Sequence, residues 1–275
     1  MSAPAHPREL ADGKLLIDEP ADGVVRLTIS NPAKRNALDH PILDAISDTL
    51  GELSAPSSPA RCVLVTGAHG MFSAGYDIGE IPDAEFEERA ERLVAHPFTQ
   101  AIDALQAFPR PTLAMLPGHT IGGGLELALA CDLRVANDAI KLGMPPAKLG
   151  LVYSHTGLRR FIDAIGAART RELFLLGSYI DAPTALAWGL VNRVAAGDAL
   201  ETLTLELAVE LAGNAPLSQT GNKRVIAALL SAEGELPAEV EEELIELRRA
   251  SFASEDMREG MRAFAERRAP RWRGR

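Results

Sequence analysis

Apolar residues in the first two thirds of the chain gather in short runs that are typical of β-strands. These runs are Leu15–Ile17, Val24–Ile29, Val63–Val65, Pro111–Leu116, Leu133–Val135 and Ile140–Leu142. The pair Asp22-Gly23 separates the first two runs and is a common hairpin turn, so we expect these two strands to be neighbours.

Helical patterns alternate with these strands. Asp39 is followed by Pro41, a combination typical of a helix N-cap and first turn. Apolar residues then recur at helical spacing and give this helix one apolar face; they are Ile42, Ile46, Leu50 and Leu53. A second helix, apolar apart from Glu126, is predicted for Leu125–Ala130. Because strands that alternate with helices imply crossover connections, the pattern favours an α/β fold.

The last third of the chain is predicted to be almost entirely helical. Pro216, Gly234 and Pro237 separate its segments, and Ser254 is placed to cap the final helix. We therefore expect three parts: a flexible N-terminal arm (residues 1–13), an α/β core (14–197) and a C-terminal helical lobe (198–275). The lobe is a candidate for packing on another subunit.

Composition and charge narrow the function classes. The 275 residues are 47% hydrophobic and carry a net charge of −10, which argues against general affinity for nucleic acid or an anionic membrane. No apolar run approaches the roughly 20 residues that span a bilayer, and the N-terminus has no apolar signal segment. Cys62 and Cys131 lie in apolar surroundings, so we expect buried free thiols and a cytoplasmic protein.

Two glycine-containing segments are the strongest candidates for chemistry. Small residues in the segment from Phe72 to Ile78 allow a ligand to approach the backbone closely. Gly122, Gly123 and Gly124 open the apolar helix and leave N–H groups at its positive end, which favours an anion or oxyanion site. The spacing does not match a phosphate-binding glycine loop. Glu126, in the first turn of this helix, either complements the helix dipole or acts as an acid or base.

Taken together, the motifs resemble those of the crotonase (enoyl-CoA hydratase/isomerase) superfamily. The motifs are Asn31–Leu38, the AGYDI stretch, the GGGLELALACDL stretch, and a downstream GLVNRV stretch that follows Ala185. The resemblance implies an α/β spiral of repeated ββα turns and C-terminal helices that build a trimer or a dimer of trimers. It also implies an acyl-CoA substrate, with CoA entering as part of that substrate and no separate cofactor or metal.

The resemblance also implies roles for individual residues. The backbone N–H groups of Tyr76 and Gly123 are expected to hold the thioester oxygen, with Glu126 and Tyr153 as the other catalytic candidates. Asp77 is expected to bond nearby backbone N–H groups, and Arg267 to reach a neighbouring subunit's CoA phosphates. The residues expected to bind the CoA thioester are Lys34, Arg35, Ala74, Asp77, Ile78, Gly122 and Arg267.

The sequence departs from the hydratase pattern at one position. Pro146 stands where hydratases carry their second catalytic glutamate, and proline cannot act as an acid or base. The loop that follows, with Tyr153, is similar to that of the methylmalonyl-CoA decarboxylase branch, although Tyr76 stands where those decarboxylases carry a histidine.

Four functions remain open at this point. Enoyl-CoA hydration ranks first because that family is broad. Decarboxylation of a methylmalonyl-CoA-like thioester and double-bond isomerisation with Glu126 as the single base are the alternatives within the family. A non-catalytic CoA-binding protein is the alternative from another class. The acyl group is not indicated by any motif.

Overall fold

The core of the protein is a large, mainly parallel sheet. A computed structural model describes residues 6–77, 97–232, 237–271 and 273. The strands of the large sheet, in spatial order, are β1 (Arg8–Leu10), β2 (Leu15–Ala21), β3 (Val24–Ile29), β4 (Cys62–Gly67), β5 (Thr112–Leu116), β7 (Leu133–Asn137) and β10 (Arg193–Ala195). β1, β2 and β3 pair antiparallel, and the pairs from β3 to β10 are parallel.

A small second sheet shows that the fold repeats. It contains β6 (Thr120–Ile121), β8 (Lys141–Gly143) and β9 (Tyr179–Asp181). The chain runs β5–β6–α4 and then β7–β8–α5, with β5 beside β7 in the large sheet and β6 beside β8 in the small one. Each turn of the chain thus places one strand in each sheet before a helix, which is the predicted spiral of ββα turns.

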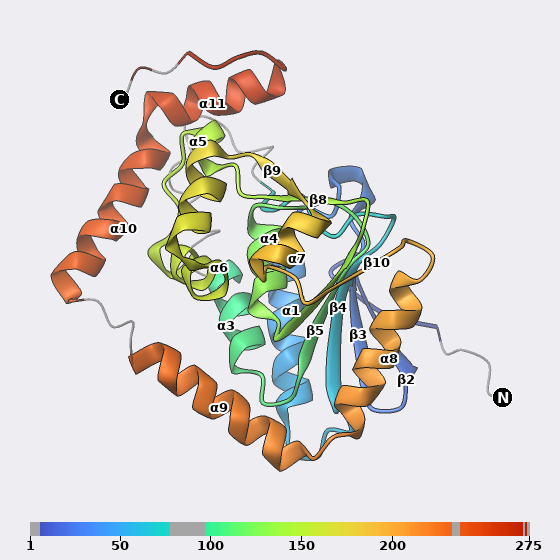
Figure 1. Cartoon of the computed structure of the whole chain (residues 1–275). Coiled ribbons are helices and arrows are strands. Elements are labelled where there is room, and N and C mark those ends of the chain that lie inside the picture. Colours follow the sequence, from blue (N-terminus) through green and yellow to red (C-terminus); the bar gives the residue numbers. More distant parts are fainter. Residues whose placement is uncertain (1–5, 78–96, 233–236, 272, 274–275) are drawn as a thin grey trace.

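Helices cover both faces of the large sheet (Figure 1). The helices of the body are α1 (His40–Ser54), α3 (Thr99–Ala107), α4 (Gly123–Ala130), α5 (Pro146–Leu149), α6 (His155–Leu176), α7 (Ala182–Trp188) and α8 (Leu200–Gly213). In β4, Val63 and Val65 join the core with α1, whereas Cys62 and Leu64 join the core with α8. Because both faces of the strand are buried, its sequence is continuously apolar rather than alternating.

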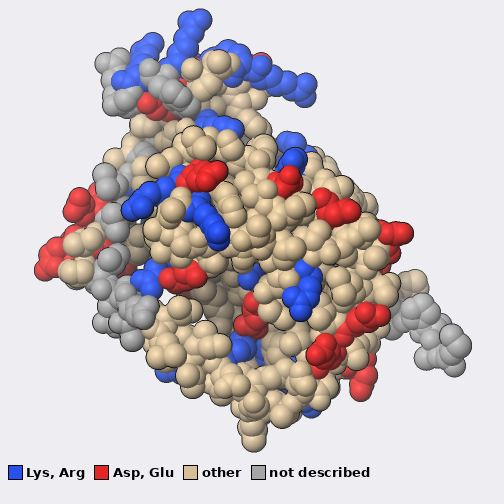
Figure 2. Space-filling model, in the orientation of Figure 1, with Lys and Arg blue, Asp and Glu red and all other residues tan. Residues whose placement is uncertain are grey.

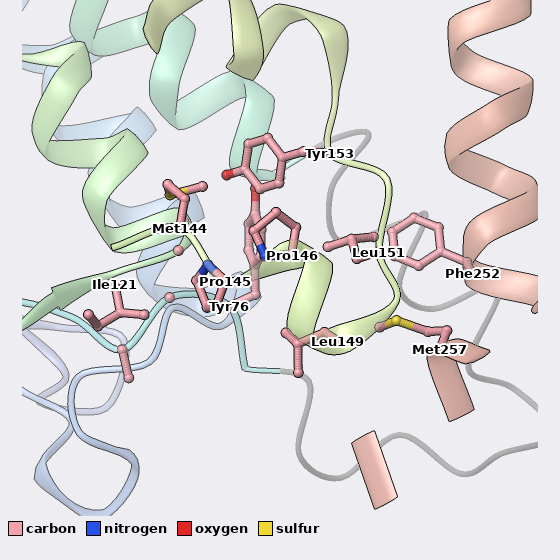
Figure 3. Close-up of a pocket in the computed structure, with 14 residues that line it drawn as sticks. Tyr76, Ile121, Met144, Pro145, Pro146, Leu149, Leu151, Tyr153, Phe252 and Met257 are labelled. Atoms are coloured by element: carbon pink, nitrogen blue, oxygen red, sulfur yellow. The ribbon is translucent and has the colours of Figure 1, made fainter. Parts of the chain in front are cut away.

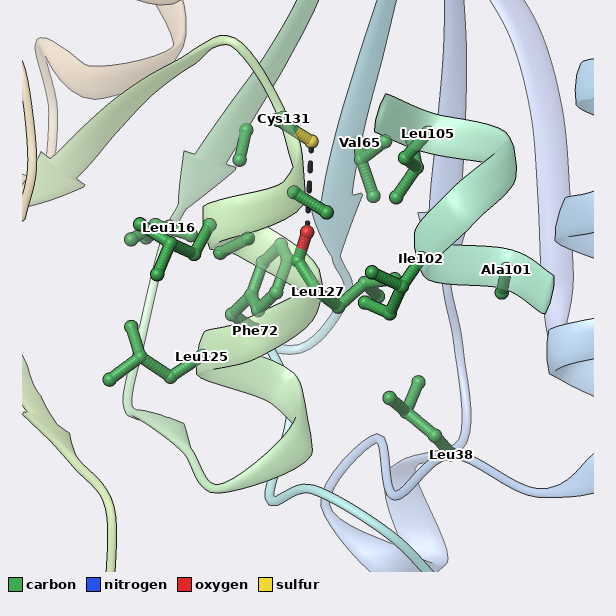
Figure 4. Packing of buried hydrophobic residues seen from close by; sticks show 14 of the residues in the cluster. Leu38, Val65, Phe72, Ala101, Ile102, Leu105, Leu116, Leu125, Leu127 and Cys131 are labelled. Carbon is green, nitrogen blue, oxygen red and sulfur yellow. Dashed lines mark hydrogen bonds between the residues drawn. The ribbon is translucent and has the colours of Figure 1, made fainter. Parts of the chain in front are cut away.

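The main core lies between the sheet and helices α3 and α4. Phe72 and Leu127 are fully buried there, beside Ile102 of α3 (Figure 4). α1 begins as predicted, because the Asp39 side chain accepts a hydrogen bond from the Ile42 N–H at 3.1 Å. This packing fixes α4, whose N-terminus carries the glycine triplet.

Two of the predicted boundaries are wrong. Within the segment predicted as a flexible arm, Arg8–Leu10 forms β1, because it pairs with β2 and Leu10 packs against the core. α8, assigned to the C-terminal lobe, belongs with the body, since Leu200 and Ala208 are buried against the large sheet. In both cases apolar contacts across the tertiary structure decide the placement.

The last helices wrap around the body and return to it (Figure 1). They are α9 (Pro216–Ala232), α10 (Ala238–Ala253) and α11 (Glu255–Ala265). Ser254 caps α11 as predicted, since its hydroxyl accepts a hydrogen bond from the Met257 N–H at 3.0 Å. Phe252 and Met257 pack on Leu149 and Leu151, so the end of the chain lies against α5 and the loop after it.

Charged side chains of both signs are interspersed over the face in Figure 2, and basic side chains gather at its top, where α11 and the C-terminal segment lie. In the described part of the chain, no helix combines the length and the hydropathy needed to cross a bilayer.

Candidate active site

The first structural element of the site is the N-terminus of α4. Gly122 has φ +56° and donates its N–H to the carbonyl oxygen of Gly143 at 2.9 Å, while its own carbonyl oxygen accepts from the N–H of Leu125. Gly123 is the first helical residue, so its N–H has no partner within the helix. This N–H therefore lies at the positive end of a fully buried helix.

The second element is the loop that contains Tyr76. Leu38 bonds to both neighbours of Tyr76, donating to Gly75 at 2.8 Å and accepting from Asp77 at 3.0 Å. Backbone groups alternate in direction along an extended segment, so the N–H of Tyr76 points to the other edge. A Cβ placed on Gly75, which has φ +98°, would lie 3.2 Å from the nitrogen of Gly123. The two predicted donors are thus brought together, and neither has an acceptor among the described residues.

A largely apolar cavity of about 100 Å³ opens beside these two residues (Figure 3). The residues that line it are Ala74, Gly75, Tyr76, Ile121, Gly122, Gly123, Met144, Pro145, Pro146, Leu149, Leu151, Tyr153, Phe252 and Met257. Phe252 and Met257 come from α10 and α11, so helices assigned from sequence to an oligomerisation lobe help to close this chain's own pocket.

Pro146 lines the pocket as the first residue of α5. None of the described residues that line the cavity is acidic. Pro146 thus lies in the pocket wall, at the position where a second carboxylate was expected to be missing.

Glu126 does not line the cavity but lies buried behind Tyr153. Its side chain is 2% exposed, and both of its oxygens are engaged. Oε2 accepts a short hydrogen bond from the Tyr153 hydroxyl, and Oε1 accepts one from Nη1 of Arg160 at 3.0 Å. Burial raises the pKa of Glu126 above its ordinary value, while Arg160 and the Tyr153 hydroxyl act in the opposite direction.

Arg160 is a site residue that the sequence did not reveal. It lies on α6 and also donates from Nε to Gln106 at 2.9 Å and from Nη2 to Asp103 at 3.1 Å, both on α3. A buried carboxylate requires a cationic or hydrogen-bonding partner. With 28 lysines and arginines in the chain, however, that requirement alone could not select one of them.

The side chain of Tyr76 also belongs to the site. Its hydroxyl lies beside that of Tyr153, as Figure 3 shows. Burial raises the pKa of both phenols well above the usual value, and the neighbouring Glu126 adds to the shift. Both tyrosines therefore remain protonated at neutral pH, and the Tyr153 hydroxyl is hydrogen-bonded to Glu126, which in turn pairs with Arg160.

The residues predicted to bind CoA are only partly brought together. Ala74 lines the cavity and donates its N–H to the carbonyl oxygen of Arg35 at 3.0 Å. Lys34 lies nearby but its Nζ pairs with Oδ2 of Asp77 at 2.8 Å. Among the described residues, the partner that the structure places against the Asp77 carboxylate is Lys34, whereas backbone N–H groups were expected there.

Arg267 is exposed just after the end of α11, in a left-handed conformation with φ +53°. This position leaves its side chain on the surface, as a contact across a subunit boundary would require. Ile78, also predicted to bind the substrate, lies outside the described residues.

Comparison with known proteins decides the family. The model of the enoyl-CoA hydratase/isomerase family matches residues 19–275. The chain belongs to this family. It is 34% identical over 252 residues to the 2,3-dehydroadipyl-CoA hydratase of Escherichia coli (strain K12), covering 92% of this chain and 96% of that protein. It is 32% identical over 243 residues to the methylmalonyl-CoA decarboxylase of the same organism, covering 88% of this chain and 91% of that protein.

Solved structures give the same family relationship. A methylmalonyl-CoA decarboxylase in complex with 2-nitronate-propionyl-CoA is similar with a TM-score of 0.85 and 30% identity, over 95% of this chain and 99% of that one. An enoyl-CoA hydratase from Mycobacterium avium subsp. paratuberculosis K-10 is similar with a TM-score of 0.78 and 26% identity, over 94% and 98%. The crotonase-type α/β fold expected from the sequence is confirmed, as is the expectation of an enzyme family that processes CoA thioesters.

Proposed function

We propose that this enzyme decarboxylates a 2-carboxyacyl-CoA thioester. The observation that carries the proposal is the state of Glu126, whose oxygens are both occupied, by Arg160 and by Tyr153. The polar side chains that face the cavity are instead the phenols of Tyr153 and Tyr76. Similarity to structures of methylmalonyl-CoA decarboxylase supports the same choice.

Binding of the thioester begins with its carbonyl oxygen. The N–H groups of Tyr76 and Gly123 donate hydrogen bonds to this oxygen and stabilise the negative charge that develops on it. One such donor contributes about 3 kcal/mol to transition-state stabilisation. The N-terminus of α4 adds the positive end of its dipole to the same oxygen.

The apolar cavity favours loss of carbon dioxide. The substrate carboxylate loses its hydration when it enters this apolar pocket, so the ground state is destabilised. The enolate that forms is stabilised instead, because its negative charge lies near the two backbone N–H donors. The bond between the α carbon and the carboxyl carbon breaks, and its electron pair becomes the enolate. Arg160 offsets the charge of Glu126, so that carboxylate does not repel the substrate.

Tyr153 then supplies one proton to the α carbon. An enolate carbon is a far stronger base than a phenolate, so the transfer is favourable even from a phenol whose pKa is raised. Water restores the proton to Tyr153 after the product leaves. This assignment requires the Tyr153 hydroxyl to turn from Glu126 toward the substrate in the complex.

Hydration, which the sequence ranked first, fits the described pocket less well. Adding water across a double bond requires carboxylates that orient the water and move its protons. Glu126 lies behind Tyr153, and Pro146 occupies the second position. The family membership itself is compatible with either reaction.

A mass-spectrometric turnover assay in D2O tests the proposal. Malonyl-CoA, methylmalonyl-CoA and crotonyl-CoA are offered separately to the wild type and to the Glu126→Gln and Tyr153→Phe variants. We expect propionyl-CoA with one deuterium at its α carbon from methylmalonyl-CoA, and no change to crotonyl-CoA. Water addition to crotonyl-CoA that disappears in Glu126→Gln, with methylmalonyl-CoA untouched, would show hydration instead.

We also propose that the chain forms a trimer or a dimer of trimers, as the family resemblance implied. α9 supports this with an exposed apolar stripe made of Val225, Ile226 and Leu229, which are 57%, 58% and 64% exposed. Such a contiguous apolar surface is typical of a protein interface. Light scattering of the wild type and of Ile226→Glu tests it, with a monomeric wild type as the contradicting result.

A further inference from the structure

The Tyr76 side chain occupies space next to the predicted thioester site. A Cβ placed on Gly123 would lie 3.0 Å from Cζ of the Tyr76 ring, so the ring lies directly against the first residue of α4. From there the phenol reaches the hydroxyl of Tyr153 (Figure 3). The two tyrosines therefore form one continuous wall of the cavity beside the oxyanion donors (Figure 3).

Further aromatic rings hold this wall in place. The ring of Phe98 meets that of Tyr76 edge to face, with centroids 4.4 Å apart, and Phe98 is 2% exposed. The ring of Phe174 meets that of Tyr153 in the same manner at 5.5 Å, and Phe161 packs behind Phe174 at 5.0 Å. Displacing a side chain in a close-packed interior costs free energy. Neither tyrosine therefore moves back to admit a larger acyl group.

We propose that the Tyr76 side chain is a specificity-determining residue that restricts the acyl group to malonyl and methylmalonyl size. The inference rests on the proposed function and deepens it by naming the substrate class. A thioester held by the N–H groups of Tyr76 and Gly123 has its acyl carbons beside the Tyr76 ring. A longer substituent on the α carbon meets the wall of Tyr76 and Tyr153.

The size limit is tested by decarboxylation rates. We expect wild-type kcat/KM to fall at least about tenfold from methylmalonyl-CoA to butylmalonyl-CoA, as is typical when methylene groups do not fit an apolar pocket. The Tyr76→Ala variant removes the ring and keeps the backbone N–H. It is expected to reduce that ratio to within about threefold, whereas Tyr76→Phe, which keeps the ring, retains the wild-type ratio.

Calorimetric binding separates this inference from the proposed reaction. Propionyl-CoA and octanoyl-CoA are titrated into the wild type, Tyr76→Ala and Phe98→Ala. We expect the wild type to bind propionyl-CoA at least about tenfold more tightly than octanoyl-CoA, and both variants to bind octanoyl-CoA more tightly than the wild type does. Phe98→Ala removes the ring that packs against Tyr76. It replaces Tyr76→Ala as the test variant if Tyr76→Ala does not fold.

The two measurements distinguish an error in the role of Tyr76 from an error in the proposed reaction. Wild-type protein that binds octanoyl-CoA as tightly as propionyl-CoA overturns the role of Tyr76, whatever the reaction is. A preference for propionyl-CoA in a wild type that decarboxylates none of the malonyl-type thioesters supports the role of Tyr76 and overturns the proposed function.

Discussion

Arg160 and Glu126 form a buried ion pair at the centre of the site: Nη1 of Arg160 lies 3.0 Å from Oε1 of Glu126, and the two side chains are 13% and 2% exposed. The pair connects α6 to α4, and the other Arg160 nitrogens bond to α3. It thereby fixes the helix that carries the glycine triplet and the carboxylate that holds Tyr153.

Removing the cation should destabilise the fold. Arg160→Met leaves the Glu126 carboxylate buried without its counter-charge, so we expect the free energy of unfolding to fall by about 3–5 kcal/mol. Urea unfolding measures it. The matched control is Arg8→Met, which breaks the solvent-exposed pair with Glu52 and should change the free energy of unfolding far less. Equal losses in the two variants would contradict a stabilising role for the buried pair.

Glu126 should also make stability depend on pH. Burial raises its pKa in the folded state, so its contribution to stability is fully present below the unfolded-state pKa and is lost as the pH rises through the folded-state pKa. The glutamine side chain of the Glu126→Gln variant cannot ionise, so this variant does not lose stability in the same way as the pH rises. Urea unfolding at several pH values between about 4.5 and 8 should therefore show the variant gaining stability relative to the wild type with rising pH. A constant difference over that range would argue against the raised pKa.

Tyr153 should act on the chemical step rather than on binding. Tyr153→Phe keeps the ring that packs on Phe174 but removes the proton, so we expect kcat for decarboxylation to fall about 100-fold or more with KM changed less than about threefold. Steady-state kinetics with methylmalonyl-CoA measures both parameters. Tyr179→Phe, at a half-exposed tyrosine on β9, is the control and should leave kcat unchanged. A Tyr153→Phe variant that keeps wild-type kcat would remove Tyr153 from the mechanism.

Close backbone packing at Gly124 should not tolerate a side chain. A Cβ there would lie 2.6 Å from Cβ of Ser73 and 2.8 Å from its carbonyl oxygen, in the loop that carries Tyr76. We expect Gly124→Ala to cost about 1–3 kcal/mol of unfolding free energy and to lower kcat/KM. Gly221→Ala on α9, where a Cβ meets nothing within 4 Å, should instead stabilise by about 0.5–1 kcal/mol. Thermal unfolding compares them, and a neutral Gly124→Ala would contradict the predicted clash.

The two cysteines should be unreactive in the folded protein. Burial raises the pKa of both thiols to about 12, and the Cys131 thiol contacts the Leu127 carbonyl oxygen at 3.9 Å (Figure 4). Because the thiolate is the reactive form, we expect negligible reaction with a chromogenic disulfide reagent at neutral pH and two thiols after denaturation. Rapid labelling of either cysteine without denaturant would show that it is accessible.

Local features of the fold and the backbone of the site followed from the sequence alone. The Asp39 and Ser254 caps, the apolar strands and the glycine loops depend on neighbouring residues and on backbone conformation, which the order of residues specifies directly. The pairing of Tyr76 with Gly123 came from a resemblance in motifs and spacing, and the structure places their backbones side by side.

Other features depend on which distant segments meet. β1 and α8 were misassigned because their positions are set by pairing and burial against the large sheet. The return of Phe252 and Met257 to the pocket joins residues that lie more than a hundred positions after Tyr76 in the chain.

The sequence by itself thus determined the alternation of strands and helices and the lack of a carboxylate at Pro146, and its resemblance to a known family predicted the spiral and the two backbone donors. Only the tertiary structure decided that Arg160 pairs with Glu126 and that the Tyr76 ring stands beside Tyr153. The physical reason is that a side chain's charge state and available space depend on everything packed around it, and residues distant in the sequence supply most of those contacts.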